Sequence, residues 1–231
     1  MLLFFSAARV VFLGQTLHHL EEGHAVLTRR AFEQCRAELP IALDHDLLIL
    51  SNQRMDMPPK RADGSIGLLG LARSLLRAQT LPKYHHGMRQ AWNHPTRTLP
   101  KVQSALYESL LATLNAPDSA AVSARMGRAF HTLQDTYTIG HVEREDHADP
   151  LSPMLRLHYS PSRKHPLISP KDRVWADAES TQLTPEAEAA VQASVAWLDV
   201  WAAHWSASSK EKQQAARDFV ARYAPIVEVK E

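Results

Sequence analysis

The stretch that most strongly determines the fold of this 231-residue chain is Ala129-Phe-His-Thr-Leu-Gln-Asp-Thr-Tyr-Thr-Ile-Gly-His141. Its first part continues a helical pattern of apolar residues. His131 and Asp135 are four residues apart, which is about 40° around a helix axis, so an imidazole and a carboxylate can converge on one cation. Residues 136–140 then break the helix and bring His141 in on new backbone. We therefore predict a metal site at the end of this helix.

Apolar residues recur at helical spacing through most of the remaining chain. The composition agrees, because only 8 of the 231 residues are glycine and good helix formers fill the long segments. Residues 146–172 are rich in proline without a convincing period, so we expect a long irregular segment there. The sequence predicts one all-α domain, a helical bundle over residues 1–231. The expected helices cover residues 16–39, 41–50, 66–79, 101–114, 119–137, 185–206 and 210–223.

Charge and cysteine content exclude several classes of function. Lysine and arginine total 26 against 25 acidic residues, so the net charge of +1 does not call for nucleic acid or an anionic membrane as a partner. The single cysteine, Cys35, excludes an internal disulfide and zinc fingers built from paired cysteines. The chain also lacks the G-x-S-x-G turn of serine hydrolases and a glycine-rich phosphate loop.

Two further stretches of the sequence supply candidates for the metal site. His24 falls on the core-facing stripe of the helix expected over residues 16–39, where an imidazole is costly to bury without a bonded partner. An apolar run delivers Asn52 and Asp56 into a proline-rich loop, where a carboxylate can face a cavity. A bonded core histidine and a loop-capping aspartate are the alternative interpretations. The 13 histidines favour metal chemistry, since imidazole is the commonest metal ligand.

These residues together resemble the zinc-dependent phospholipase C family of bacteria, whose fold is shared with the single-strand-specific zinc nucleases of fungi and plants. The resemblance spans residues 20 to about 177. It implies an all-helical domain that binds about two to three zinc ions in a cleft and hydrolyses phosphodiesters. It rests on Gly23-His-Ala-Val-Leu-Thr28, Ser51-Asn-Gln-Arg-Met-Asp56, Tyr84-His-His-Gly-Met-Arg89, and Phe130-His-Thr-Leu-Gln-Asp135 with His141 after it.

The resemblance implies the ligands of a first zinc ion. These would be Asp56, His131, Asp135 and a histidine from residues 84–86. We favour His86 over His85, because the Gly-Met-Arg that follows matches the family. Asp56 would also act as a general base that accepts the proton of the attacking water.

A second zinc ion would be bound by His141, a later histidine and an acid. His165 is the best match for that histidine. Family members place the acid three or four residues later, where this chain has a serine, so Asp172 is the nearest candidate. Asp177 and Glu145 are its rivals.

A third zinc ion would be bound by His24, with Asp135 as a bridge between ions. Family members complete this site with an N-terminal tryptophan, and no tryptophan precedes Trp92 here. Glu21, three residues before His24, is a candidate substitute. This site is therefore expected to be differently liganded or weaker.

The function that the resemblance implies is a phospholipase C. Such an enzyme uses metal-activated water to cleave a phospholipid into diacylglycerol and a phosphorylated head group, with transient contact to a membrane surface. No stable nucleic-acid partner is expected, since the chain lacks an interleaved basic and aromatic groove. A zinc nuclease is the alternative, and the head group, the number of ions and the oligomeric state stay open.

The N-terminus leaves two interpretations. The apolar stretch Leu2–Leu13 is too short to cross a bilayer. It lacks a basic n-region and a clear cleavage site, so residues 1–15 are either a signal segment or part of a first buried helix. The family resemblance implies a secreted or periplasmic protein.

Two other functions compete with this interpretation. His45-Asp46 is the adjacent pair used by helical phosphohydrolases of the HD type, although it leads straight into the apolar residues 47–50. The other alternative is a non-catalytic helical interaction domain whose histidines are incidental. Metal content separates the zinc enzyme from the interaction domain, because only the enzyme should carry about three tightly bound zinc ions.

Overall fold

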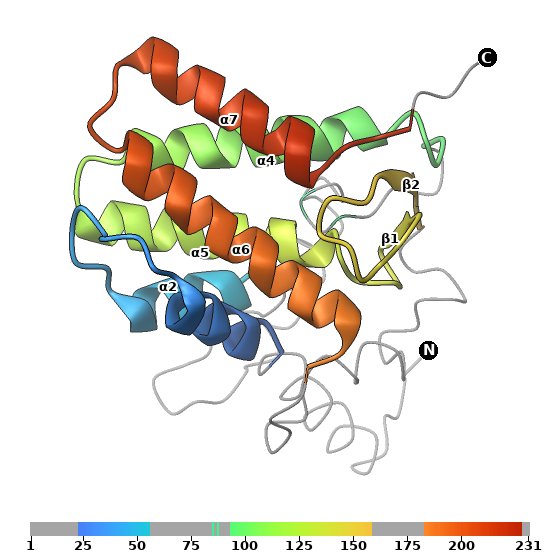
Figure 1. The fold of residues 1–231 in the computed structure, drawn as a ribbon, viewed down its shortest axis with the longest axis horizontal. Helices are drawn as coiled ribbons and strands as arrows, with labels where there is room; N and C mark the ends of the chain where they lie inside the picture. The colour runs from blue at the N-terminus through green and yellow to red at the C-terminus, as the bar shows by residue number, and fades with distance from the viewer. Residues whose placement is uncertain (1–22, 56–84, 86, 88–92, 159–182, 228–231) are drawn as a thin grey trace, which may run out of the picture.

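The computed structural model describes residues 23–55, 85, 87, 93–158 and 183–227 (Figure 1). Most of these residues lie in helices, so the predicted helical character of the fold is confirmed. None of the described helices is both long and apolar enough to cross a membrane. Residues 23–34 are helical, and the elements that follow are α2 (His45–Gln53), α4 (Leu99–Leu114), α5 (Ser119–Asp135), β1 (Val142–Arg144), β2 (Met154–Leu157), α6 (Pro185–His204) and α7 (Ser209–Tyr223).

Helix α5 lies in the middle of the described helices, in contact with α2, α4 and α6 (Figure 1). It begins at Ser119 because the carboxylate of Asp118 accepts a hydrogen bond from the backbone N–H of Ala121 at 2.8 Å. Gly127 permits a close approach of α2, since a Cβ at this position would lie 2.1 Å from the backbone oxygen of Leu48. The α2 helix is thus packed directly against the middle of α5.

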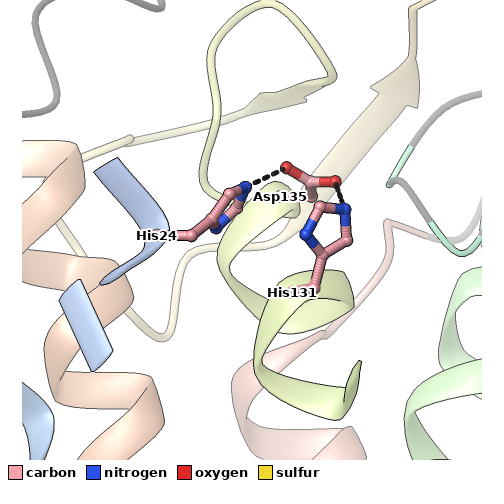
Figure 2. A group of neighbouring side chains, drawn as sticks. All are labelled: His24, His131 and Asp135. Atoms are coloured by element: carbon pink, nitrogen blue, oxygen red, sulfur yellow. Dashed lines mark ion pairs between the residues drawn. The ribbon is translucent and has the colours of Figure 1, made fainter. Parts of the chain in front are cut away.

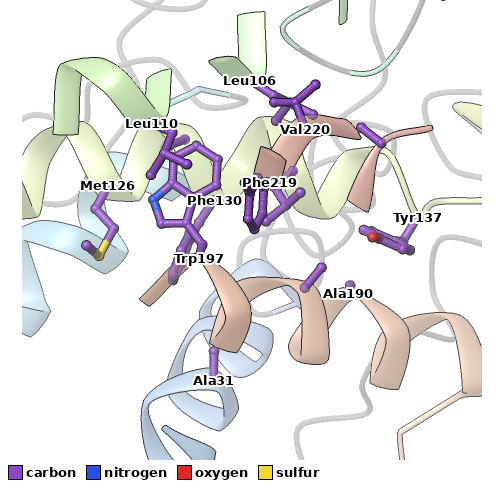
Figure 3. Close-up of a cluster of buried hydrophobic side chains, with 14 of the residues drawn as sticks. Ala31, Leu106, Leu110, Met126, Phe130, Tyr137, Ala190, Trp197, Phe219 and Val220 are labelled. Atoms are coloured by element: carbon purple, nitrogen blue, oxygen red, sulfur yellow. The ribbon is translucent and has the colours of Figure 1, made fainter. Parts of the chain in front are cut away.

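Aromatic side chains from three helices form the centre of the hydrophobic core (Figure 3). Trp197 of α6 meets Phe130 of α5 edge to face, with ring centroids 6.5 Å apart. On its other side it meets Phe219 of α7 in the same way at 5.1 Å. Trp197 and Phe130 are fully buried. Through this core, α6 packs against α7 and against α5, the helix that carries His131 and Asp135.

A short antiparallel sheet follows α5, and the sequence analysis did not predict it. Val142 pairs with Leu157, and the register shifts between Glu143 and Arg144. The prediction that residues 146–172 are irregular is wrong for β2, because strands this short give no readable alternation. Their pairing depends instead on the turn that joins them, which sequence periodicity does not report. Residues 159–172 lie outside the described part of the chain.

Arg144 ties this sheet to the ends of two helices. Its buried guanidinium donates to the backbone oxygens of Thr136 at 2.9 Å and Tyr223 at 3.3 Å, at the C-terminal ends of α5 and α7. Helix C-termini favour a positive charge. The guanidinium also lies 4.0 Å from the centroid of the Tyr137 ring. Burial lowers the pKa of Arg144, and burial raises the pKa of Tyr137 to about 12. These bonds fix the turn that leads to His141.

The helix boundaries differ from prediction at the N-terminal end. Of the helix expected over residues 16–39, residues 23–34 are helical and residues 35–39 are not, while residues 16–22 lie outside the described chain. The helix expected over 41–50 begins at His45, because Asp44 caps it by accepting from the N–H of Leu47 at 2.9 Å. It extends to Gln53, so Asn52 lies in a helix and the loop predicted for it is wrong.

The other helix predictions have two outcomes. The four predictions over 101–114, 119–137, 185–206 and 210–223 are confirmed as α4, α5, α6 and α7, with small shifts at their ends. The helix expected over 66–79 lies outside the described residues.

Candidate metal centre

The last turn of α5 carries the first two candidate ligands (Figure 2). His131 Nε2 lies 3.1 Å from the Asp135 Oδ2 atom, as expected for side chains four residues apart on one helix face. His131 is fully buried and Asp135 is 2% exposed. The two side chains therefore lie together as their spacing indicates, and their binding of a cation stays a prediction.

His24 joins them from the helix at residues 23–34. Its Nε2 atom lies 3.5 Å from Asp135 Oδ1, and the His24 and His131 rings are 4.5 Å apart between centroids. One potential ligand atom from each of His24, His131 and Asp135 lies within 4.8 Å of the others, and among the described residues this is the one group of three or more such side chains that meets this condition. The placement of His24 on a core-facing stripe is confirmed, since it is 6% exposed.

The imidazole of His141 is the third one that lies beside the Asp135 carboxylate. Its Nδ1 atom lies 3.4 Å from Asp135 Oδ1. The turn that delivers it is held by backbone bonds from Thr138 N–H to Asp135 O at 3.1 Å and from His141 N–H to Thr138 O at 2.8 Å. The N–H of His158, just after β2, donates to His141 O at 2.7 Å. The break after α5 therefore brings His141 back to Asp135.

The charge on Asp135 is favoured by its neighbours. Burial by itself would raise the pKa of this carboxyl. The adjacent imidazoles of His131 and His141 act against burial and hold the pKa of Asp135 well below its usual range. A buried anion is stable only when cationic or hydrogen-bonding groups compensate it. The site is therefore built to place a carboxylate, rather than a neutral acid, among imidazole nitrogens.

A layer of buried polar side chains lies directly behind His24. The His24 Nδ1 atom is 2.8 Å from Gln134 Oε1. Asn52 Nδ2 donates to the same oxygen and to Thr28 Oγ1, both at 3.1 Å. Gln134 and Thr28 were not predicted as part of the site, and Asn52 was predicted to lie in a loop. The available signal was that all three stand in the quoted motifs, with Gln134 directly before Asp135.

Gly87 places part of the 84–89 motif beside this site. It has φ +57°, and a Cβ at this position would lie 3.1 Å from the backbone oxygen of Asp135. Glycine suits both the left-handed backbone and the close contact. His85 is half-buried, whereas His86, the favoured ligand, lies outside the described residues. The choice between the two histidines stays a prediction.

Several predicted site residues cannot be placed. The candidates that lie outside the described residues are Asp56, His165, Asp172, Asp177 and Glu21. Their roles as ligands, and the role of Asp56 as base, stay predictions. Glu145 is described and exposed, in the turn between β1 and β2.

His45 and Asp46, the pair considered for an HD-type phosphohydrolase, are the first two residues of α2. Both residues are exposed in the first turn of α2. The His45 ring lies 4.5 Å from the ring of Phe32 between centroids. Asp46 adds an acidic charge to the N-terminal turn, where the helix dipole favours it.

The donor set of the cluster fits a transition-metal ion. Imidazole nitrogen and carboxylate oxygen are the ligands of catalytic zinc sites, and here they are buried and share one carboxylate. Comparisons with protein-family models, with curated proteins and with solved structures find no match. An argument about function therefore starts from the cluster around Asp135.

Proposed function

We propose that this chain is a zinc-dependent phosphodiester hydrolase with its metal centre at Asp135. The observation that carries the proposal is that three imidazoles approach one buried carboxylate. His131, His24 and His141 place ring nitrogens 3.1, 3.5 and 3.4 Å from its oxygens. Imidazole nitrogens and a carboxylate gathered in one buried place are the donor set that a transition-metal ion prefers.

The distribution of nitrogens supports a bridging role for Asp135. Oδ2 faces His131, while Oδ1 faces both His24 and His141. Asp135 would be the residue shared between two ions, because imidazoles lie at both of its oxygens. This is the role that the family resemblance implies for Asp135.

The chain's own residues would perform distinct tasks. Asp135 would hold the ions through its two oxygens, and the neutral imidazoles of His24, His131 and His141 would bind through their lone pairs. Zinc, when bound, lowers the pKa of its bound water and stabilises developing negative charge on phosphate oxygens. The buried position of the cluster strengthens these electrostatic effects by excluding bulk water.

We propose phospholipids as the substrate class, cleaved to diacylglycerol and a phosphorylated head group. The support is the family resemblance together with the near-neutral charge of +1, which gives little attraction for a polyanionic nucleic acid. The cluster itself would serve any phosphodiester, so the choice of phospholipid rests on the resemblance and the charge.

The test measures zinc content and turnover on the full-length protein. Purified protein should contain about two to three zinc ions and should hydrolyse short-chain phosphatidylcholine faster than single-stranded DNA or RNA at the same zinc concentration. His131→Ala and Asp135→Ala should each abolish turnover. The loss of zinc should be larger for Asp135→Ala, because both of its oxygens face imidazoles.

His204→Ala is the matched control, because it removes a histidine that lies outside the cluster. His204, at the end of α6, is hydrogen-bonded through Nδ1 to Val200 O of its own helix at 2.9 Å. It should retain zinc and activity. Rapid nucleic-acid cleavage without lipid turnover would move the assignment to the nuclease branch. Wild-type protein without bound zinc, or zinc retained in full by Asp135→Ala, would refute the metal centre.

A further inference from the structure

The polar layer behind His24 is a closed hydrogen-bond network with Gln134 at its centre. The Oε1 atom of Gln134 faces His24 Nδ1 at 2.8 Å and Asn52 Nδ2 at 3.1 Å. Its Nε2 atom faces Thr28 Oγ1 at 3.3 Å and Ser194 Oγ at 3.5 Å. Gln134, Asn52 and Ser194 are fully buried, and Thr28 is 1% exposed. These residues come from the first described helix and from α2, α5 and α6, so the network joins four elements at one amide.

The orientation of the Gln134 amide follows from what each alternative leaves unbonded. Of the polar atoms in the Gln134 and Asn52 amides, Asn52 Oδ1 is the one that has no hydrogen-bond partner among the described residues. Turning both amides over would direct Gln134 Nε2 at His24 and would place Asn52 Nδ2, with two N–H groups, where Oδ1 now lies. A buried N–H without a partner is rarer and costlier than a carbonyl oxygen without one. The orientation with Oε1 toward His24 is therefore favoured.

This orientation decides which nitrogen of His24 carries the proton. Because Gln134 Oε1 can only accept, the neutral His24 ring donates from Nδ1. Its lone pair is then on Nε2, the atom that lies 3.5 Å from Asp135 Oδ1. Two electron-rich atoms facing each other at this distance favour a cation between them.

We propose that Gln134 is a positioning residue, which holds His24 in the tautomer whose Nε2 lone pair faces the metal centre, and that Asn52 orients the Gln134 amide. The role in metal binding rests on the proposed function, whereas the tautomer of His24 does not. Groups that fix the tautomer of a metal-binding histidine typically contribute 10- to 100-fold to metal affinity. Thr28 restrains the network further by accepting from both amides.

The first experiment reads the tautomer directly in the metal-free full chain. Long-range ¹H–¹⁵N NMR of histidine-labelled protein, at alkaline pH where imidazole is neutral, distinguishes a protonated Nδ1 from a protonated Nε2. The His24 signals are identified by their loss in His24→Asn. Wild-type protein should show Nδ1–H, Gln134→Glu should keep it by retaining an acceptor, and Gln134→Leu should shift the proton to Nε2.

Two results of this experiment would overturn the proposal. One is a wild-type His24 protonated on Nε2, and the other is an unchanged Nδ1–H in Gln134→Leu. The wild-type spectrum alone decides the tautomer if Gln134→Leu does not fold.

The second experiment measures zinc affinity by competition with a chelator. Gln134→Leu should bind zinc about 10- to 100-fold more weakly than wild type, and Gln134→Glu should recover most of the loss. Gln103→Leu is the control, because Gln103 on α4 also donates a hydrogen bond, to Ala224 O at 2.7 Å, but contacts no described ligand of the site. It should leave zinc affinity unchanged.

The outcomes separate the two proposals. An equal loss of affinity in Gln134→Leu and Gln103→Leu would show general destabilisation and would refute the positioning role. Wild-type protein that binds no zinc would refute the proposed function, while the NMR result would still decide the tautomer.

Discussion

The middle of helix α5 and its C-terminal end are buried to the same degree but hold opposite kinds of side chain. In the middle, Met126 and Phe130 are fully buried among apolar groups, and Phe130 packs on Trp197 (Figure 3). At the end, His131 and Asp135 are buried beside the imidazole of His24 (Figure 2). The first region gains stability from burial. In the second region, each buried polar group lowers the stability of the fold unless it has a hydrogen-bonding or ionic partner.

This difference indicates where each kind of substitution should act. Changes in the apolar middle should lower the free energy of unfolding and leave the chemistry of the folded molecules intact. Changes at the polar end should remove metal binding and activity. The apolar middle thus supplies the stability that offsets the cost of a buried polar end.

Trp197→Ala should have the largest effect on stability. It removes a fully buried indole that contacts Phe130 and Phe219, and such a change typically costs about 3–5 kcal/mol. We expect urea unfolding to show this loss, while protein that remains folded at low temperature still binds zinc. Trp205→Ala should cost less, because Trp205 is only half-buried. Equal losses in both variants, or loss of zinc from folded Trp197→Ala, would contradict the separation of the two regions.

The same comparison explains which site residues were predictable from sequence. His131 and Asp135 follow from helical spacing alone, and His141 follows from the break after their helix. His24 follows from an imidazole on an apolar stripe. Each of these is a local pattern, and each places its side chain at the described cluster.

Gln134 and Asn52 were not predictable for a physical reason. Buried glutamine and asparagine inside a helix add nothing to its apolar period, and their roles depend on partners from other helices that only folding brings together. Asn52 reaches His24's partner because α2 packs on α5 at Gly127. The sheet was missed for the same reason, since β1 and β2 are defined by their pairing and by the anchoring of Arg144.

Tyr137→Phe tests the hydrogen bonding that holds the turn leading to His141 against the rest of the fold. The Tyr137 hydroxyl, which has one proton to donate, lies 2.8 Å from Pro150 O and 3.0 Å from Tyr223 O, and burial raises its pKa from 10.0 to about 12. A pKa raised on folding contributes stability below pH 10 that is lost as pH rises toward 12, because the unfolded chain releases the proton first. Two pKa units correspond to about 3 kcal/mol.

The measurement is urea unfolding at a series of alkaline pH values. Tyr137→Phe should be less stable than wild type at neutral pH by about 1–3 kcal/mol, because it removes the hydrogen bond that the buried hydroxyl donates to a backbone oxygen. The gap between the two proteins should then narrow from pH 10 to 12 as wild type loses its extra stability. A gap that stays constant over this range would mean that Tyr137 does not titrate as a buried group.

Gly127→Ala should have the smallest effect, and its sign is the informative part. In a helix with free space, replacing glycine with alanine stabilises by about 0.5–1 kcal/mol. Here the added Cβ would lie 2.1 Å from Leu48 O and 2.9 Å from Ser51 Cβ, so α2 must move away from α5. Overpacking of this kind costs about 1–3 kcal/mol, so we expect a net loss of stability in urea unfolding. Because α2 carries Asn52, zinc affinity should fall as well, in the direction expected for Gln134→Leu but by less. A stabilised Gly127→Ala protein with unchanged zinc affinity would mean that α2 does not lie this close to α5, and the polar layer behind His24 would then need a different source of order.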